Sequence, residues 1–152
     1  LLELIPTSHT KESIILHVKK FVQYVLGKRF IVVNYVPSFV ADRVCTQTMN
    51  DIMYRAEQQN LTITDVDALT GLAIGRPKTD TYALSDLVGL DIAVSVIKGM
   101  QQVPEEAPYY HNVKVVNTLF DIGTLGRKTK QGFYKKDKDT KEHLVYDKEE
   151  QD

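Results

Sequence analysis

The sequence predicts a mainly α-helical domain preceded by a short β–α–β unit. Residues 1–36 hold two short apolar runs with an amphipathic helical pattern between them. After Pro37 the β signal mostly vanishes, and apolar residues recur at helical spacing in several segments up to about residue 136. The remaining residues, 137–152, are strongly charged and are interpreted as a tail or linker. We therefore expect three parts: 1–36, 37–136 and 137–152.

The first part begins with a buried strand over residues 1–5, interrupted only by the carboxylate of Glu3. A helix follows from Lys11, with Thr10 as its expected N-cap and Gly27 as its expected stop. The apolar run 30–33 is a second buried strand. A strand, a helix and a strand in so short a segment form a β–α–β unit, so the two strands should be parallel.

This unit is interpreted as the end of a longer sheet domain. The chain starts with Leu1 rather than Met, and residues 1–5 are typical of a domain interior. One β–α–β unit cannot form a stable sheet alone. We therefore expect further strands upstream of Leu1 and interpret the chain as a fragment of a longer protein.

The second part is predicted to be helical. The longest expected helix covers 38–59, with Ser38 suited to its N-cap, and the next begins at Thr64 with Asp67 completing a capping box. Gly89 should end a helix. The remaining expected elements are helices over 82–88, 91–100 and 111–120 and a small hairpin formed by 131–135 and 143–146.

Composition excludes several classes of protein. Hydrophobic residues make up 43% and charged residues 26%, the balance of a globular protein. A formal net charge of −1 disfavours a nucleic-acid binder, which should be clearly basic. No apolar run approaches the ~20 residues that a membrane span needs. The single cysteine, Cys45, cannot form an internal disulfide, which fits a reducing cytosol, so we expect a cytoplasmic protein.

General catalytic signals are weak. The four histidines are scattered and no metal-ligand spacing is present, so no metal site is expected. The glycine-rich fingerprint of dinucleotide-binding domains is also missing. A cofactor-binding domain would therefore have to lie upstream of Leu1.

Four short motifs carry more information through their order and spacing. They are the segment 1–7 with Glu3, Pro37–Arg43, Asp86–Asp91, and 125–134 with Lys128. Together they resemble the C-terminal part of the NAD-dependent 3-hydroxyacyl-CoA dehydrogenases, whose pattern is roughly L-x-E-[VI]-I, P-G-F-[VI]-x-N-R, D-x-x-G-[LI]-D and L-G-x-K-[TS]-G-x-G-F-Y. The loop 75–79 resembles the branch of this family that is fused to an enoyl-CoA hydratase-like part.

The resemblance implies a fold and an activity. A Rossmann-type domain, of which 1–36 would be the β–α–β remnant, binds NAD. The helical C-terminal domain dimerises and closes over the acyl-CoA substrate. Hydride moves between C3 of a 3-hydroxyacyl-CoA and the nicotinamide during fatty-acid β-oxidation, with a histidine as general base. That histidine would lie about a dozen residues before Leu1, so the fragment itself should be inactive.

The resemblance also assigns roles to three residues. Glu3 matches the carboxylate that orients the general-base histidine; the alternative is an ordinary edge-strand glutamate facing water. Lys128 matches the lysine that reaches NAD, with a solvated turn lysine as the alternative. Asp42 stands where the family has a substrate-binding asparagine, and Lys130 where it has a glycine, so substrate positioning and the local turn are in doubt.

Asp42 keeps three readings open. Its carboxyl is held protonated, or it accepts a hydrogen bond from the substrate hydroxyl, or the site is degraded. The last reading gives the rival function: a non-catalytic dimerisation and acyl-CoA-docking module of a degraded dehydrogenase. A third possibility is a related two-domain dehydrogenase that acts on another hydroxy acid.

Overall fold

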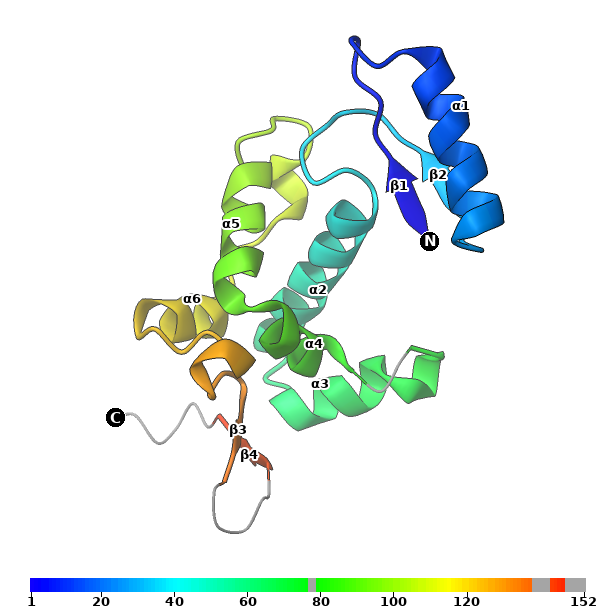
Figure 1. The fold of residues 1–152 in the computed structure, drawn as a ribbon. Helices are drawn as coiled ribbons and strands as arrows, with labels where there is room; N and C mark the ends of the chain where they lie inside the picture. The colour runs from blue at the N-terminus through cyan, green and yellow to red at the C-terminus, as the bar shows by residue number, and fades with distance from the viewer. Residues whose placement is uncertain (77–78, 138–142, 147–152) are drawn as a thin grey trace. The chain divides into compact units, whose positions relative to one another are not determined.

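The computed structural model describes residues 1–76, 79–137 and 143–146. The chain divides into two compact units, Leu1–Cys45 and Thr46–Asp152. Figure 1 shows the order of their helices and strands. The expectation of a mainly α fold that begins with a β–α–β unit is confirmed. The domain boundaries at 36 and 136 stay a prediction.

The first unit opens with two parallel strands, β1 (Leu2–Leu4) and β2 (Phe30–Val32), which pair with Glu3 opposite Ile31. Between them run α1 (Glu12–Lys20) and a π-helical turn, Phe21–Val25. The parallel pairing is therefore confirmed (Figure 1). The strand residues are half-buried or, at Val32, exposed rather than buried, because the described residues supply only two strands to this sheet.

The predicted end of α1 is confirmed, but its predicted N-cap is not. Gly27 adopts a left-handed φ of 60° after the π-helical turn, as expected of a stop residue. Thr10 does not cap the helix: Lys11 holds the N-cap position without a side-chain cap. The Thr10 hydroxyl instead accepts a hydrogen bond from the Thr7 amide at 3.0 Å, because it closes the preceding turn.

The longest helix, α2 (Ala41–Gln58), starts three residues later than predicted. Ser38 and Phe39 precede it with left-handed φ values of 60° and 45°, so Ser38 is part of a tight turn and is not an N-cap. Glycine adopts such values without the steric cost that a Cβ adds. The family pattern has glycine at this position, and the structure shows the conformational reason.

Ser38→Gly is expected to stabilise the chain by about 1 kcal/mol, because it removes a left-handed serine. Urea unfolding of the chain measures the change. Ser8→Gly is the matched control: Ser8 lies in an exposed turn and has no positive φ, so this change should give no gain. Equal effects of the two substitutions would contradict the prediction.

Four more helices lie among the described residues of the second unit. α3 (Ile63–Thr70) begins with a capping box, but its members are Thr62 and Asp65 rather than Thr64 and Asp67. α4 (Thr81–Val88) ends at Gly89 as predicted, and α5 (Leu90–Met100) follows without a side-chain cap from Asp91. The remaining elements are α6 (Lys114–Asp121), the 3-10 turns Leu72–Ile74, Ala107–Tyr109 and Arg127–Thr129, and the strands β3 (Tyr134–Lys136) and β4 (His143–Val145).

β3 and β4 form the predicted antiparallel hairpin, with Lys135 opposite Leu144. The loop between them and the tail 147–152 lie outside the described residues. No helix among the residues that the structure places is long and apolar enough to cross a membrane.

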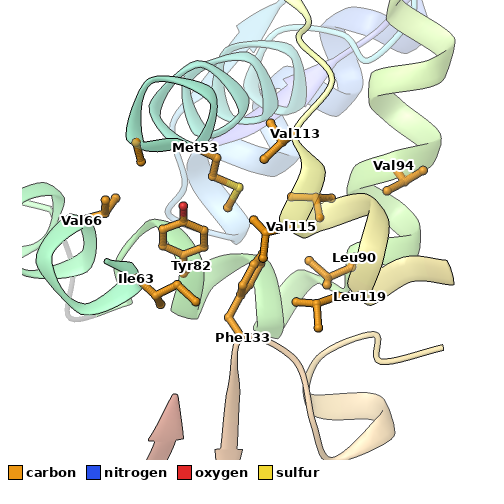
Figure 2. Close-up of a cluster of buried hydrophobic side chains, with 12 residues drawn as sticks. Met53, Ile63, Val66, Tyr82, Leu90, Val94, Val113, Val115, Leu119 and Phe133 are labelled. Carbon is orange, nitrogen blue, oxygen red and sulfur yellow. The ribbon is translucent and has the colours of Figure 1, made fainter. Parts of the chain in front are cut away.

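The core of the second unit collects one or more apolar side chains from each of its helices (Figure 2). Phe133 is fully buried and meets the Tyr82 ring edge-on, with 4.6 Å between ring centroids. Met53 is 4% exposed and Met100 is 1% exposed, so both methionines fill the core. The core therefore joins the hairpin region to the helices through Phe133.

Candidate functional site

Glu3 is bound at the beginning of α2. Its Oε1 accepts a hydrogen bond from the Ala41 amide at 2.7 Å, and its Oε2 accepts one from the Val40 amide at 3.1 Å. The first amides of a helix lack partners within the helix and favour a negative charge. The contact with the backbone amides explains why a carboxylate lies on an otherwise apolar strand. The alternative interpretation, an edge-strand glutamate that only faces water, is wrong.

Asp42 lies next to this contact. It is exposed and belongs to the first turn of α2, directly after Ala41, whose amide Glu3 holds. The structure therefore brings two of the sequence-predicted site residues to one end of one helix, within the first compact unit. Two carboxylates therefore lie at the beginning of α2: Glu3 is bound to its amides, and Asp42 is exposed.

Lys128 belongs to the second unit, where its ammonium pairs with the Asp91 carboxylate. This pairing lowers the pKa of Asp91. Gly89, with a φ of 104°, makes room for the lysine: a Cβ there would stand 2.6 Å from Lys128 Nζ. The lysine side chain is 42% exposed. Sequence reasoning missed Asp91 as its partner, although both residues belong to the recognised motifs.

The doubt about the turn at Lys130 is also answered. Lys130 follows the 3-10 turn Arg127–Thr129 and has a left-handed φ of 62°. This is the conformation that glycine adopts readily. The turn therefore keeps a glycine-like backbone although the residue is lysine.

Asp86 connects two of the four motifs. It is 4% exposed, and its carboxylate accepts hydrogen bonds from the amides of Phe133 at 2.9 Å and Tyr134 at 2.8 Å. Gly126 and Gly132 lie so close that a Cβ on either would overlap Asp86. Burial raises the pKa of Asp86, and the two amide hydrogen bonds oppose that shift. These motif residues therefore lock the segment 126–134 onto α4.

Two further carboxylates hold helix beginnings in the same way. Asp67 accepts hydrogen bonds from the amides of Tyr82 at 2.7 Å and Ala83 at 3.1 Å, and from the Tyr134 hydroxyl at 2.7 Å. Glu57 accepts from the first two amides of α6 at 3.1 and 2.8 Å. The sequence pattern missed both residues because each acts on a helix far along the chain.

Tyr82 gives this region a pH-dependent stability. Burial, with smaller contributions from Glu57 and Asp67, raises the pKa of Tyr82 to about 12, whereas an exposed tyrosine ionises near ~10. The folded chain therefore keeps a proton that the unfolded chain has lost. This stabilisation is present below about pH 10 and is lost as pH rises through the folded pKa.

We expect the free energy of unfolding to fall by up to about 1.4 kcal/mol per pH unit between about pH 10 and 12 for this tyrosine. Tyr82→Phe should make the fall shallower by that amount. Tyr109→Phe is the control because Tyr109 is 58% exposed. Urea unfolding at pH 9 to 12 checks the prediction, and parallel slopes for both variants would refute it.

Among the residues that the structure describes, no group of three or more histidine, cysteine, aspartate or glutamate side chains could hold a metal ion. This finding gives no candidate metal centre.

Comparisons with known proteins agree on one family. The family model of the 3-hydroxyacyl-CoA dehydrogenase C-terminal domain matches residues 39–136. A Deinococcus radiodurans protein named "Probable 3-hydroxyacyl-CoA dehydrogenase" is 37% identical over 141 residues, which are 93% of this chain and 41% of that relative. A Rickettsia prowazekii protein, whose name includes "fatty acid oxidation complex trifunctional enzyme", is 32% identical over 139 residues, which are 89% of this chain and 19% of that relative.

The solved structures give the same result. The crystal structure of M. tuberculosis FadB2 superposes with a TM-score of 0.78 at 28% identity, covering 88% of this chain and 47% of that chain. The chain thus spans less than half the length of the relatives it matches. The match over 39–136, together with the motifs that the structure locks together, shows that this chain belongs to the family of 3-hydroxyacyl-CoA dehydrogenase C-terminal domains.

Proposed function

We propose that the chain is the C-terminal portion of an NAD-dependent dehydrogenase that transfers hydride between a 3-hydroxyacyl-CoA and NAD in fatty-acid β-oxidation. The observation that carries this proposal is the carboxylate of Glu3, which the Val40 and Ala41 amides hold at the beginning of α2, beside Asp42. A general base that acts next to a substrate needs a fixed carboxylate to orient it and an accessible polar side chain to bind the substrate. The family match over 39–136 agrees with it.

Glu3 acts on the proton-transfer step. Each carboxylate oxygen can accept about two hydrogen bonds, so the two amides leave capacity for the N–H of a histidine contributed from upstream. The carboxylate then fixes the tautomer of the imidazole and stabilises the imidazolium that forms when the substrate hydroxyl loses its proton. Because the amides hold the carboxylate, the histidine is oriented without further rearrangement.

Asp42 is proposed to face the reacting end of the acyl-CoA. An ionised carboxylate has no N–H to donate, but it can accept a hydrogen bond from the 3-hydroxyl. The exposed position of Asp42 in the first turn of α2 leaves it accessible to such a ligand. Asp42 therefore suits the hydroxyl form of the substrate better than the ketone form.

Lys128 is the proposed contact to NAD. A lysine ammonium has three N–H donors, and the pair with Asp91 leaves others for a phosphate or ribose oxygen. Its 42% exposure fits such a contact. When bound, NAD supplies the carbon that accepts hydride. In this proposal Asp42 orients the substrate, Glu3 supports the general base, and Lys128 contacts a phosphate or ribose oxygen of NAD.

The experiment is a comparison of the chain with the full-length protein. Acetoacetyl-CoA reduction is followed by loss of NADH absorbance. We expect turnover by the full-length protein and none above background by the chain alone, because the chain has no dinucleotide fingerprint. Turnover by the pure chain would contradict the fragment interpretation.

The rival function keeps one supporting observation. Asp42 replaces the family asparagine, which fits a non-catalytic module that docks acyl-CoA and dimerises. The same assay separates the two functions. A full-length protein that binds acyl-CoA without turnover would establish the rival.

A two-fold homodimer in the cytoplasm is part of the proposal. Met49 and Met53 of the long helix α2 are buried inside the second unit, so they offer no apolar surface to a partner. Exposed apolar side chains near the end of α3 support the dimer instead: Leu69 is 59%, Leu72 67% and Ile74 60% exposed.

Light scattering on the full-length protein tests the dimer, and Leu72→Glu is expected to shift it toward the monomer because a charge cannot be buried there without cost. Leu144→Glu is the control at another exposed leucine, on the β4 hairpin strand, 48% exposed. A monomeric parent at micromolar concentration would contradict this proposal.

A further inference from the structure

We infer that Glu3 positions the first turn of α2, and with it Asp42, on strand β1. Glu3 is then a positioning residue for the substrate end of the site as well as for the base. This inference rests on the proposed function for its catalytic consequence, but the contact on which it depends lies within this chain.

The first support is the geometry of the contact. Both carboxylate oxygens are used, on consecutive amides that lie 37 and 38 positions further along the chain. Two hydrogen bonds accepted by one planar carboxylate restrict both the distance and the rotation of the helix beginning. Because Glu3 is the middle residue of β1 and pairs with Ile31 of β2, the helix start is tied to the sheet.

The second support is the strained backbone before the helix. Ser38 and Phe39 both have left-handed φ values, which are costly for residues with a Cβ. Such conformations persist only where surrounding contacts over-determine them, and they concentrate at functional sites. The Arg43 amide bonds the Ser38 carbonyl at 3.1 Å on the helix side, and Glu3 holds the next two amides after Phe39.

The consequence for Asp42 follows from helix geometry. Asp42 directly follows Ala41, whose amide Glu3 binds, in the first turn of α2. Residues of one helical turn move together because their backbone spacing and rotation are fixed. The contact that holds the Ala41 amide on β1 therefore also fixes where Asp42 lies relative to the sheet.

Amide hydrogen exchange of the chain, followed residue by residue by NMR, tests the contact without any assay of activity. In Glu3→Gln one oxygen becomes an NH2 group, so one of the two amides loses its acceptor. We expect exchange at Val40 or Ala41 to rise roughly tenfold to hundredfold, the range for a hydrogen bond to a charged acceptor. Glu3→Asp, which shortens the side chain, should release both amides.

Two matched glutamates serve as controls. Glu12 is exposed in the first turn of α1, so Glu12→Gln should leave Val40 and Ala41 unchanged. Glu57 holds the first two amides of α6, so Glu57→Gln should raise exchange at Lys114 or Val115 instead. If Glu3→Gln and Glu3→Asp both leave Val40 and Ala41 within twofold of Glu12→Gln, the inference is overturned.

The catalytic consequence is measured in the full-length protein. Misdirection of Asp42 should raise KM for the acyl-CoA about tenfold in Glu3→Gln, in addition to any change in kcat. A lowered kcat with unchanged KM would show that Glu3 acts on the base alone, and would overturn the inference. If the unsubstituted protein lacks turnover while Val40 and Ala41 respond, the proposed function fails and the link between Glu3 and α2 stands.

Discussion

Replacing Glu3 by glutamine in the full-length protein is expected to lower kcat by about 10²–10⁴-fold, the scale of lost acid–base support. Glutamine can still accept a hydrogen bond from either the Val40 or the Ala41 amide, but it is neutral and cannot stabilise an imidazolium by charge. Steady-state reduction of acetoacetyl-CoA by NADH measures the effect.

The control for this prediction is Glu12→Gln, which makes the same chemical change on an exposed helix turn. It should leave kcat within about twofold of the unsubstituted protein, because single surface changes of this kind usually have small effects. A kcat for Glu3→Gln within about threefold would mean that Glu3 only holds the helix.

Gly126→Ala is expected to destabilise the chain by about 3 kcal/mol or more. Gly126 has a left-handed φ of 94°, which any L side chain adopts only with strain. The added Cβ would also overlap the backbone of Asp86, which cannot rotate away as a side chain would. Loss of this approach separates the segment 126–134 from α4.

Gly99→Ala is the matched control for that substitution. Gly99 lies inside α5 with nothing near its added Cβ, so alanine there should stabilise the helix by up to about 1 kcal/mol. Urea unfolding of both variants therefore gives changes of opposite sign. A loss below about 1 kcal/mol for Gly126→Ala would contradict the interpretation of the motif as a lock.

Most helices and strands can be predicted from the local sequence, because apolar residues recur at helical spacing in the helices and form short continuous runs in the strands. Residues 1–5 and 30–33 were assigned as strands from their apolar runs, and the structure pairs them in parallel. Gly89 was assigned as a helix stop, and α4 ends there. These predictions depend only on residues that are close together in the sequence, so the sequence alone is enough to make them.

The helix beginnings were predicted poorly for the opposite reason. α2, α4 and α6 have their first amides bound by Glu3, Asp67 and Glu57, which come from distant elements. The local pattern therefore predicts Ser38 as the cap of α2, whereas the structure places Ser38 in a left-handed turn. Long-range caps cannot be seen in a sequence window because the chain must fold before they exist.

The candidate site shows the same division. The motif resemblance selected Glu3, Asp42 and Lys128, and the structure places the first two at one end of α2. It could not reveal that Glu3 binds backbone amides or that Lys128 pairs with Asp91. Their roles toward histidine, substrate and NAD stay predictions, since those partners belong to the proposed full-length protein.

The most direct test of the account is the transfer of hydride itself. The full-length protein is incubated with acetoacetyl-CoA and NADH that carries deuterium at the transferable position of the nicotinamide ring, and the product is analysed by mass spectrometry and NMR. The proposed function predicts deuterium at C3 of the 3-hydroxyacyl-CoA product. Binding of both ligands without deuterium at C3 would contradict it.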